Sequence, residues 1–150
     1  MNGRPEQRRV VRRWIAKAEE DNLAAECLFK LGRSCPLGLV GFHAQQCAEK
    51  YLKALLLHEG LAVPRVHDLN VLVRLVPPTR VPGLDPADLA RLSRYVIEGR
   101  YPDEWEPIRR SQVRKAIALA KRIRKVVLLN LPRRFGHPHR RYPAPGGGGR

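Results

Sequence analysis

Three long segments carry apolar residues at the spacing of an α-helix, and this periodicity limits the fold more than any other feature. The segments run from about residue 7 to 31, from about 36 to 59, and from about 107 to 131. No segment alternates apolar and polar residues over five or six positions, the pattern of a half-buried strand. The sequence therefore predicts an all-α protein with four or five helices in a bundle.

The second long segment is apolar on more than one face. Six of its residues share about 80° of arc on a helical wheel: Val40, Ala44, Cys47, Ala48, Tyr51 and Leu55. Four further apolar residues fall outside that stripe: Leu39, Phe42, Leu52 and Leu56. This helix is therefore expected to be central or to form part of an oligomer seam.

Two shorter helices are expected at about 68–76 and 85–97. Asp85 stands directly before Pro86, the pattern of an N-cap followed by proline at the first helical position. His67-Asp68 precedes the other helix, and capping is favoured over a catalytic His–Asp dyad. Residues 1–131 are expected to form the bundle, and the Arg-, Pro- and Gly-rich residues 132–150 a disordered tail.

Positive charge is concentrated in the C-terminal third. The chain has 29 Lys and Arg against 14 Asp and Glu, a net charge of +15. Residues 107–150 hold thirteen basic residues and no acid, whereas residues 1–106 have a net charge of only +2. Such a region attracts polyanions, because neutralised phosphates release counterions, and it also suits an acidic protein partner.

Composition excludes several classes of protein. There is no run of 18 apolar residues and no apolar stretch after the basic N-terminus, so we expect neither a membrane span nor a secretory signal. Three cysteines lack metal-type spacing, which favours a reduced, cytoplasmic protein. No metal site and no cofactor are expected.

Three ordered motifs resemble those of the HEPN domain family. Residues 41–56 read Gly-Phe-His-Ala-Gln-Gln-Cys-Ala-Glu-Lys-Tyr-Leu-Lys-Ala-Leu-Leu; residues 64–69 read Pro-Arg-Val-His-Asp-Leu, and 99–103 read Gly-Arg-Tyr-Pro-Asp. The first helix is also similar around residues 14–25. The resemblance covers about residues 8–130. It implies an up-and-down helical bundle that forms a homodimer and acts beside a small nucleotidyltransferase, often as a toxin–antitoxin pair.

HEPN proteins that cleave RNA use an Arg-x(4–6)-His motif without a metal, and this sequence departs from that pattern. Arg100 is the arginine nearest the expected place, and no histidine follows it until His137. The spacing occurs as a string between Arg134 and His139, inside the predicted tail. Arg100 is therefore the candidate catalytic residue, without the histidine that the resemblance implies.

Four residues of the predicted bundle are candidates for nucleotide or RNA binding. His43 and Lys50 share one edge of the central helix. They either form part of a phosphate-facing groove or are boundary and surface residues, with His43 hydrogen-bonded inside the bundle or the dimer. Arg100 can hold a phosphate with two hydrogen bonds, and Tyr101 can stack on a base. Alternatively, these two residues form a structural corner, with Arg100 paired to an acid and Tyr101 in the core.

A basic stripe marks the last helix. Arg110, Arg114, Lys121 and Lys125 fall within about 60° of arc on the wheel, with no acid on the helix to balance them. The stripe is either a solvated charged face or a phosphate-binding surface.

Three hypotheses follow from these patterns. The first is a HEPN protein that binds nucleotide or RNA beside a nucleotidyltransferase. The second is a metal-independent endoribonuclease with a degenerate motif. The third is an interaction module whose cationic face docks an acidic protein.

Overall fold

This computed structural model describes residues 4–98 and 105–135, which contain five α-helices and two short 3-10 helices. The α-helices are α1 (Pro5–Phe29), α2 (Leu37–His58), α3 (Leu69–Leu75), α4 (Pro86–Glu98) and α5 (Arg110–Asn130); the 3-10 helices are η1 (Gly32–Ser34) and η2 (Arg133–Phe135). These residues contain no strand, and the all-α prediction is confirmed. None of the described helices is both long and apolar enough to span a membrane.

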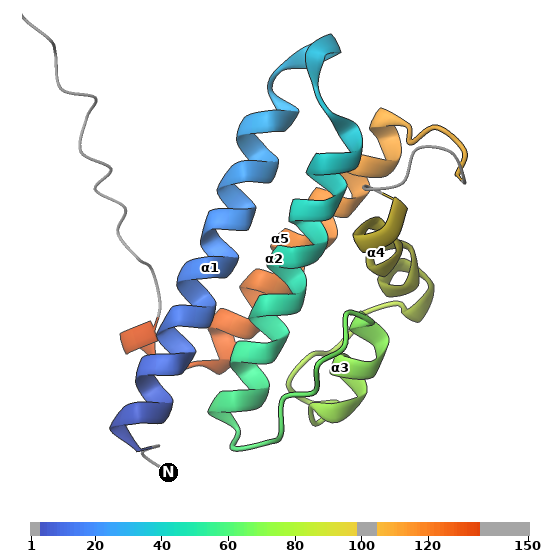
Figure 1. Cartoon of the computed structure of the whole chain (residues 1–150). Coiled ribbons are helices and arrows are strands. Elements are labelled where there is room, and N and C mark those ends of the chain that lie inside the picture. Colours follow the sequence, from blue (N-terminus) through green and yellow to red (C-terminus); the bar gives the residue numbers. More distant parts are fainter. Residues whose placement is uncertain (1–3, 99–104, 136–150) are drawn as a thin grey trace, which may run out of the picture.

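Helix α2 is the centre of the bundle. It runs antiparallel to α1, with α5 behind the pair and with α3 and α4 on the side away from α1 (Figure 1). It contacts all four other α-helices. Its predicted stripe is buried, and so are Leu52 and Leu56 outside the stripe, whereas Leu39 is exposed. Packing within one chain therefore accounts for Leu52 and Leu56, but not for Leu39.

Local sequence sets the helix boundaries. Asp68 Oδ1 accepts a hydrogen bond from the Asn70 amide at 2.9 Å, and Asp85 Oδ1 accepts one from the Ala87 amide at 2.8 Å. Both predicted caps are therefore present. The last helix begins at Arg110, three residues after Pro107, because Arg109 is extended and the Gln112 side chain accepts a hydrogen bond from its amide.

The packed structure extends past the predicted end of the bundle at residue 131. The described residues beyond that point include η2, where Phe135 is buried. The Phe135 ring meets His58 of α2 edge-on, with ring centroids 5.8 Å apart.

Gly41 permits the close approach of α2 and α4. A Cβ at this position would lie 2.7 Å from Tyr95 Cδ1 of α4, so Gly41→Ala displaces a buried ring. We expect this substitution to lower the free energy of unfolding by about 1–3 kcal/mol, although alanine is the better helix former. Urea unfolding measures the change, and in a Tyr95→Ala background the cost should disappear. An equal cost in both backgrounds would show that the ring is not its cause.

Candidate nucleic-acid interface

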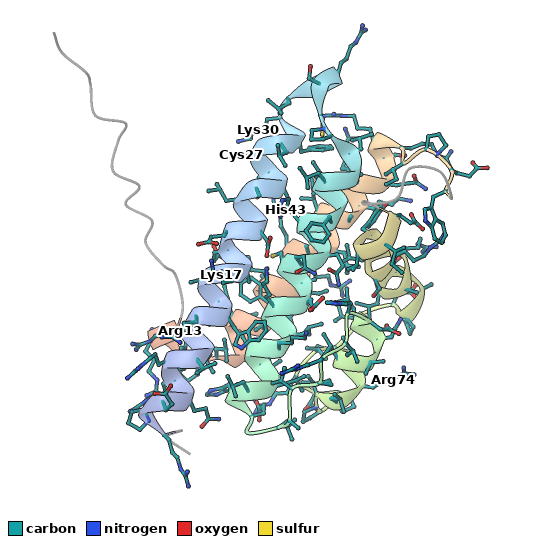
Figure 2. The ribbon with its side chains drawn as sticks, viewed as in Figure 1. Arg13, Lys17, Cys27, Lys30, His43 and Arg74 are labelled. Atoms are coloured by element: carbon teal, nitrogen blue, oxygen red, sulfur yellow. The ribbon has the colours of Figure 1, made fainter. Side chains whose placement is uncertain are left out.

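His43 and Lys50 of α2 both contact Asp21 of α1. Figure 2 labels His43 on α2, beside α1. His43 Nδ1 lies 2.8 Å from Asp21 Oδ1, and Lys50 Nζ donates to the other carboxylate oxygen. The histidine and lysine side chains are 24% and 22% exposed, and that of Asp21 is 11% exposed. The carboxylate balances the charge of Lys50, and the two contacts cross-link α1 and α2. His43 is therefore bonded within the bundle, one of the two alternatives that the sequence left open.

Asp21 is absent from the residues that the sequence singled out. It lies three residues after buried Ala18 and four before buried Ala25, on the apolar side of α1. The signal that could have identified Asp21 is a carboxylate on an apolar stripe, because a buried carboxylate needs a partner.

A second cross-link joins α1, α2 and α5. Arg124 Nε donates to Glu19 Oε1 at 2.5 Å, and the Tyr51 hydroxyl donates to the same oxygen. Burial raises the pKa of Tyr51, and the hydrogen bond to Glu19 and its charge raise it further. The hydrogen bond to Glu19 also raises the pKa of Arg124. The guanidinium is held by this contact, with the Arg124 side chain 28% exposed.

A third polar cluster lies between α2 and the segment before α3, with Gln45, Glu49 and Lys53 buried and His67 at its exposed edge. Lys53 Nζ donates to Glu49 Oε1 at 2.8 Å, while Gln45 Nε2 and His67 Nδ1 each lie 3.0 Å from Glu49 Oε2. The lysine and glutamate side chains are only 7% and 5% exposed. Glu49 and Lys53 stand four residues apart on one helix, a spacing that predicts an ion pair but not its burial. His67 therefore faces Glu49, while Asp68 caps α3.

The Glu49 cluster makes stability depend on pH. Burial acts to raise the pKa of Glu49, but hydrogen bonds from Lys53, Gln45 and His67 outweigh it, and the pKa lies below its ordinary 4.5. A depressed carboxyl pKa contributes stability above the unfolded-state pKa, and this contribution is lost as pH falls through the folded-state pKa. We therefore expect the stability difference between wild type and Glu49→Gln to shrink from pH 6 to pH 3 in urea unfolding. A constant difference would contradict this assignment.

The predicted basic stripe of α5 lies along α1. Arg110 donates to the carbonyls of Phe29 at 3.0 Å and Gly32 at 3.1 Å, and its guanidinium lies 4.1 Å from the centroid of the Phe29 ring. The guanidinium carbon of Arg114 lies 5.9 Å from the centroid of the same ring. Lys121 forms a 2.7 Å ion pair with Glu26 of α1. The exposed Lys125 contacts no acid among the described residues.

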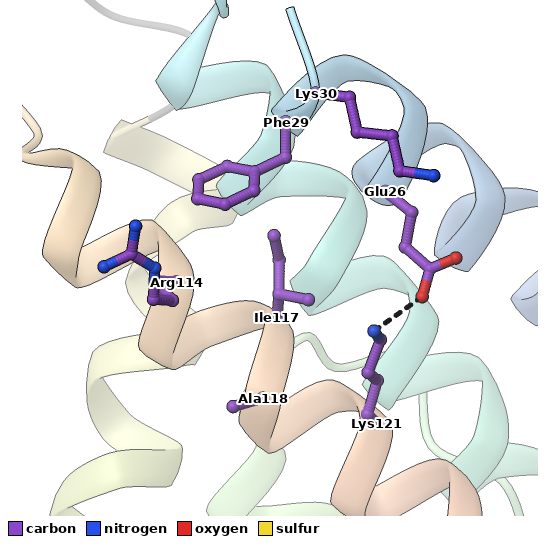
Figure 3. Close-up of a pocket in the computed structure, with 7 residues that line it drawn as sticks. All are labelled: Glu26, Phe29, Lys30, Arg114, Ile117, Ala118 and Lys121. Atoms are coloured by element: carbon purple, nitrogen blue, oxygen red, sulfur yellow. Dashed lines mark ion pairs between the residues drawn. The ribbon is translucent and has the colours of Figure 1, made fainter. Parts of the chain in front are cut away.

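Two cavities lie beside this stripe, and we call the surface that contains them the α1–α5 face. Cavity 1 has a volume of about 430 Å³ and is lined by Glu26, Phe29, Lys30, Arg114, Ile117, Ala118 and Lys121. Cavity 2 has a volume of about 680 Å³ and is lined by Asn22, Glu26, Lys121, Arg124, Lys125, Leu128, Leu129, Leu131 and Arg133. Figure 3 shows cavity 1 between the two helices, with the Glu26–Lys121 ion pair across it.

The structure brings together only part of the predicted binding set. Arg110, Arg114, Lys121 and Lys125 share the α1–α5 face. His43 and Lys50 line neither cavity, since Asp21 holds them between α1 and α2. Arg100 and Tyr101 lie outside the described residues. The described residues contain no cluster of three or more His, Cys, Asp or Glu side chains suited to a metal.

The comparisons with protein families and with solved structures point to the same family. The HEPN domain family model matches residues 11–131. The crystal structure of TT1696 from Thermus thermophilus is similar with a TM-score of 0.69 and 28% identity, over 81% of this chain and 98% of that chain. The crystal structure of ST0689, an archaeal HEPN homologue, has a TM-score of 0.60 and 27% identity, over 80% and 96% of the two chains. The comparison with curated proteins gives no match.

Proposed function

The chain belongs to the HEPN domain family, and from this premise we propose that it binds the phosphates of RNA or of a nucleotide on its α1–α5 face. One observation carries the proposal: α5 holds seven cations and no acid, and four of these cations, Arg114, Lys121, Arg124 and Lys125, line the cavities of this face. The ion pairs with α1 involve two of them, Lys121 with Glu26 and Arg124 with Glu19. The remaining positive charge is not balanced by acids of the described residues.

The apolar cavities favour binding over a merely solvated charged face. Sites for small ligands combine an apolar lining with a few polar groups and span about 300–1,000 Å³. Both cavities fall in that range, and each places apolar side chains beside cations. A base or ribose on the apolar lining and a phosphate on the cations would use both features.

The family suggests the setting of this binding. HEPN proteins often dimerise, and the resemblance described above implies a small nucleotidyltransferase as partner. We therefore propose a homodimer that acts in the cytoplasm beside such an enzyme, in a toxin–antitoxin-like module. The free thiol of the exposed Cys27 is compatible with a reducing compartment.

The proposal is tested with purified protein and a mixed single-stranded RNA pool in EDTA, with retardation and cleavage scored together. We expect retardation at 50 mM salt that is largely lost at 200 mM, because counterion release drives binding. Cleavage that Arg100→Ala abolishes would instead support the endoribonuclease alternative. No retardation at low salt would contradict the proposal and leave the face to an acidic protein.

A further inference from the structure

Building on the proposed function, we infer that cavities 1 and 2 together hold two consecutive nucleotides of single-stranded RNA. In this arrangement Lys121 holds the phosphate between the nucleotides, and Glu26 is a built-in competitor for that lysine.

The two cavities adjoin at the Glu26–Lys121 ion pair, since both residues line both cavities. Nζ of Lys121 lies 2.7 Å from the Glu26 carboxylate, and the two side chains are 52% and 34% exposed. An ion pair at this exposure contributes little free energy, so an incoming phosphate can displace the carboxylate. The pair therefore occupies the position of a phosphate that links ligands in the two cavities.

Each cavity has its own surface for a base. Cavity 1 offers Phe29, Ile117 and Ala118, with Arg114 beside them. A base packed there contacts apolar side chains, and the phosphate next to it meets a cation.

Cavity 2 combines three leucines with polar groups. Leu128, Leu129 and Leu131 line it, and Leu129 is 76% exposed, unusual for a large apolar side chain. Asn22 contributes an amide that can both donate to and accept from a base edge. Two separate base surfaces require bases that are splayed apart, which single-stranded RNA allows and a duplex does not.

The first test compares the dinucleoside monophosphate ApA with AMP in NMR titrations at 50 mM salt. We expect ApA to bind more tightly than AMP, because it fills both cavities. Glu26→Gln should tighten ApA binding about two- to fivefold, the range for loss of an exposed competing ion pair. The control Glu20→Gln removes an equal charge from α1, where Glu20 pairs with Lys17, and should leave ApA affinity unchanged.

The second test fills cavity 1 without changing charge. Ala118 is exposed, and leucine is a good helix former, so Ala118→Leu should fold and reduce ApA affinity to that of AMP. The control Ala90→Leu changes an exposed alanine of α4 and should have no effect.

The outcomes separate this inference from the proposed function. Salt-dependent binding of long RNA, with ApA affinity unchanged in Glu26→Gln and Ala118→Leu, would overturn the two-nucleotide site and leave the proposed function standing. If neither ApA nor long RNA binds, both fail. Binding of an acidic, leucine-containing peptide that Ala118→Leu abolishes, without ApA binding, would assign the face to a protein partner.

Discussion

Replacing Lys121 and Lys125 together with glutamate is expected to weaken single-stranded RNA binding at low salt on the order of 100-fold. Each reversal removes an attraction worth about 0.7 kcal/mol at an exposed site and adds a comparable repulsion, so the two reversals cost about 2.8 kcal/mol, and every 1.4 kcal/mol is a tenfold change. Both lysines line cavity 2 on the α1–α5 face. Fluorescence anisotropy with labelled RNA measures the loss.

The matched control is Arg65→Glu with Arg74→Glu, which changes the net charge equally. Both arginines are exposed, and Arg74 lies on α3, across α2 from Lys17 of α1 (Figure 2). At the same salt concentration this variant should bind RNA within about threefold of wild type, because charges farther away than the Debye length are largely screened. An equal loss in both variants would mean that net charge, and not the α1–α5 face, determines binding.

Replacing Glu49 with alanine is expected to lower the free energy of unfolding by about 3–5 kcal/mol, the usual cost of leaving one member of a buried ion pair unpartnered. The Lys53 ammonium would lose its carboxylate while only 7% of its side chain is exposed. Gln45 and His67 would lose the same acceptor. Urea unfolding measures the change through the midpoint at constant m-value.

A double variant separates the ion pair from the packing. Glu49→Leu with Lys53→Met replaces both charges with apolar groups, and such replacements are often neutral or stabilising. This variant should therefore be more stable than Glu49→Ala. If the double variant is the less stable of the two, the unpaired lysine is not the cause of the loss.

The sequence predicted the helices and the basic stripe because both depend on local periodicity. Residues at helical spacing share a face in any straight helix, which places Arg110, Arg114, Lys121 and Lys125 along one side of α5. The caps of α3 and α4 were also predictable from local sequence, because each N-cap contacts an amide only two residues ahead.

The cross-helix partners could not be predicted in this way. Whether Asp21 meets His43 and Lys50, or Glu26 meets Lys121, depends on how α1 is positioned along α2 and α5. That position is set by side-chain packing over the whole core and not by any local pattern.

The salt dependence of RNA affinity tests the central claim most directly. For single-stranded nucleic acid, log K against log salt falls with a slope of about 0.7 per neutralised phosphate. If Lys121 and Lys125 each contact a phosphate, the glutamate double variant should have a slope shallower by about 1.4, while the Arg65/Arg74 control keeps the wild-type slope. Equal slopes in wild type and the Lys121/Lys125 variant would show that RNA does not bind on the α1–α5 face.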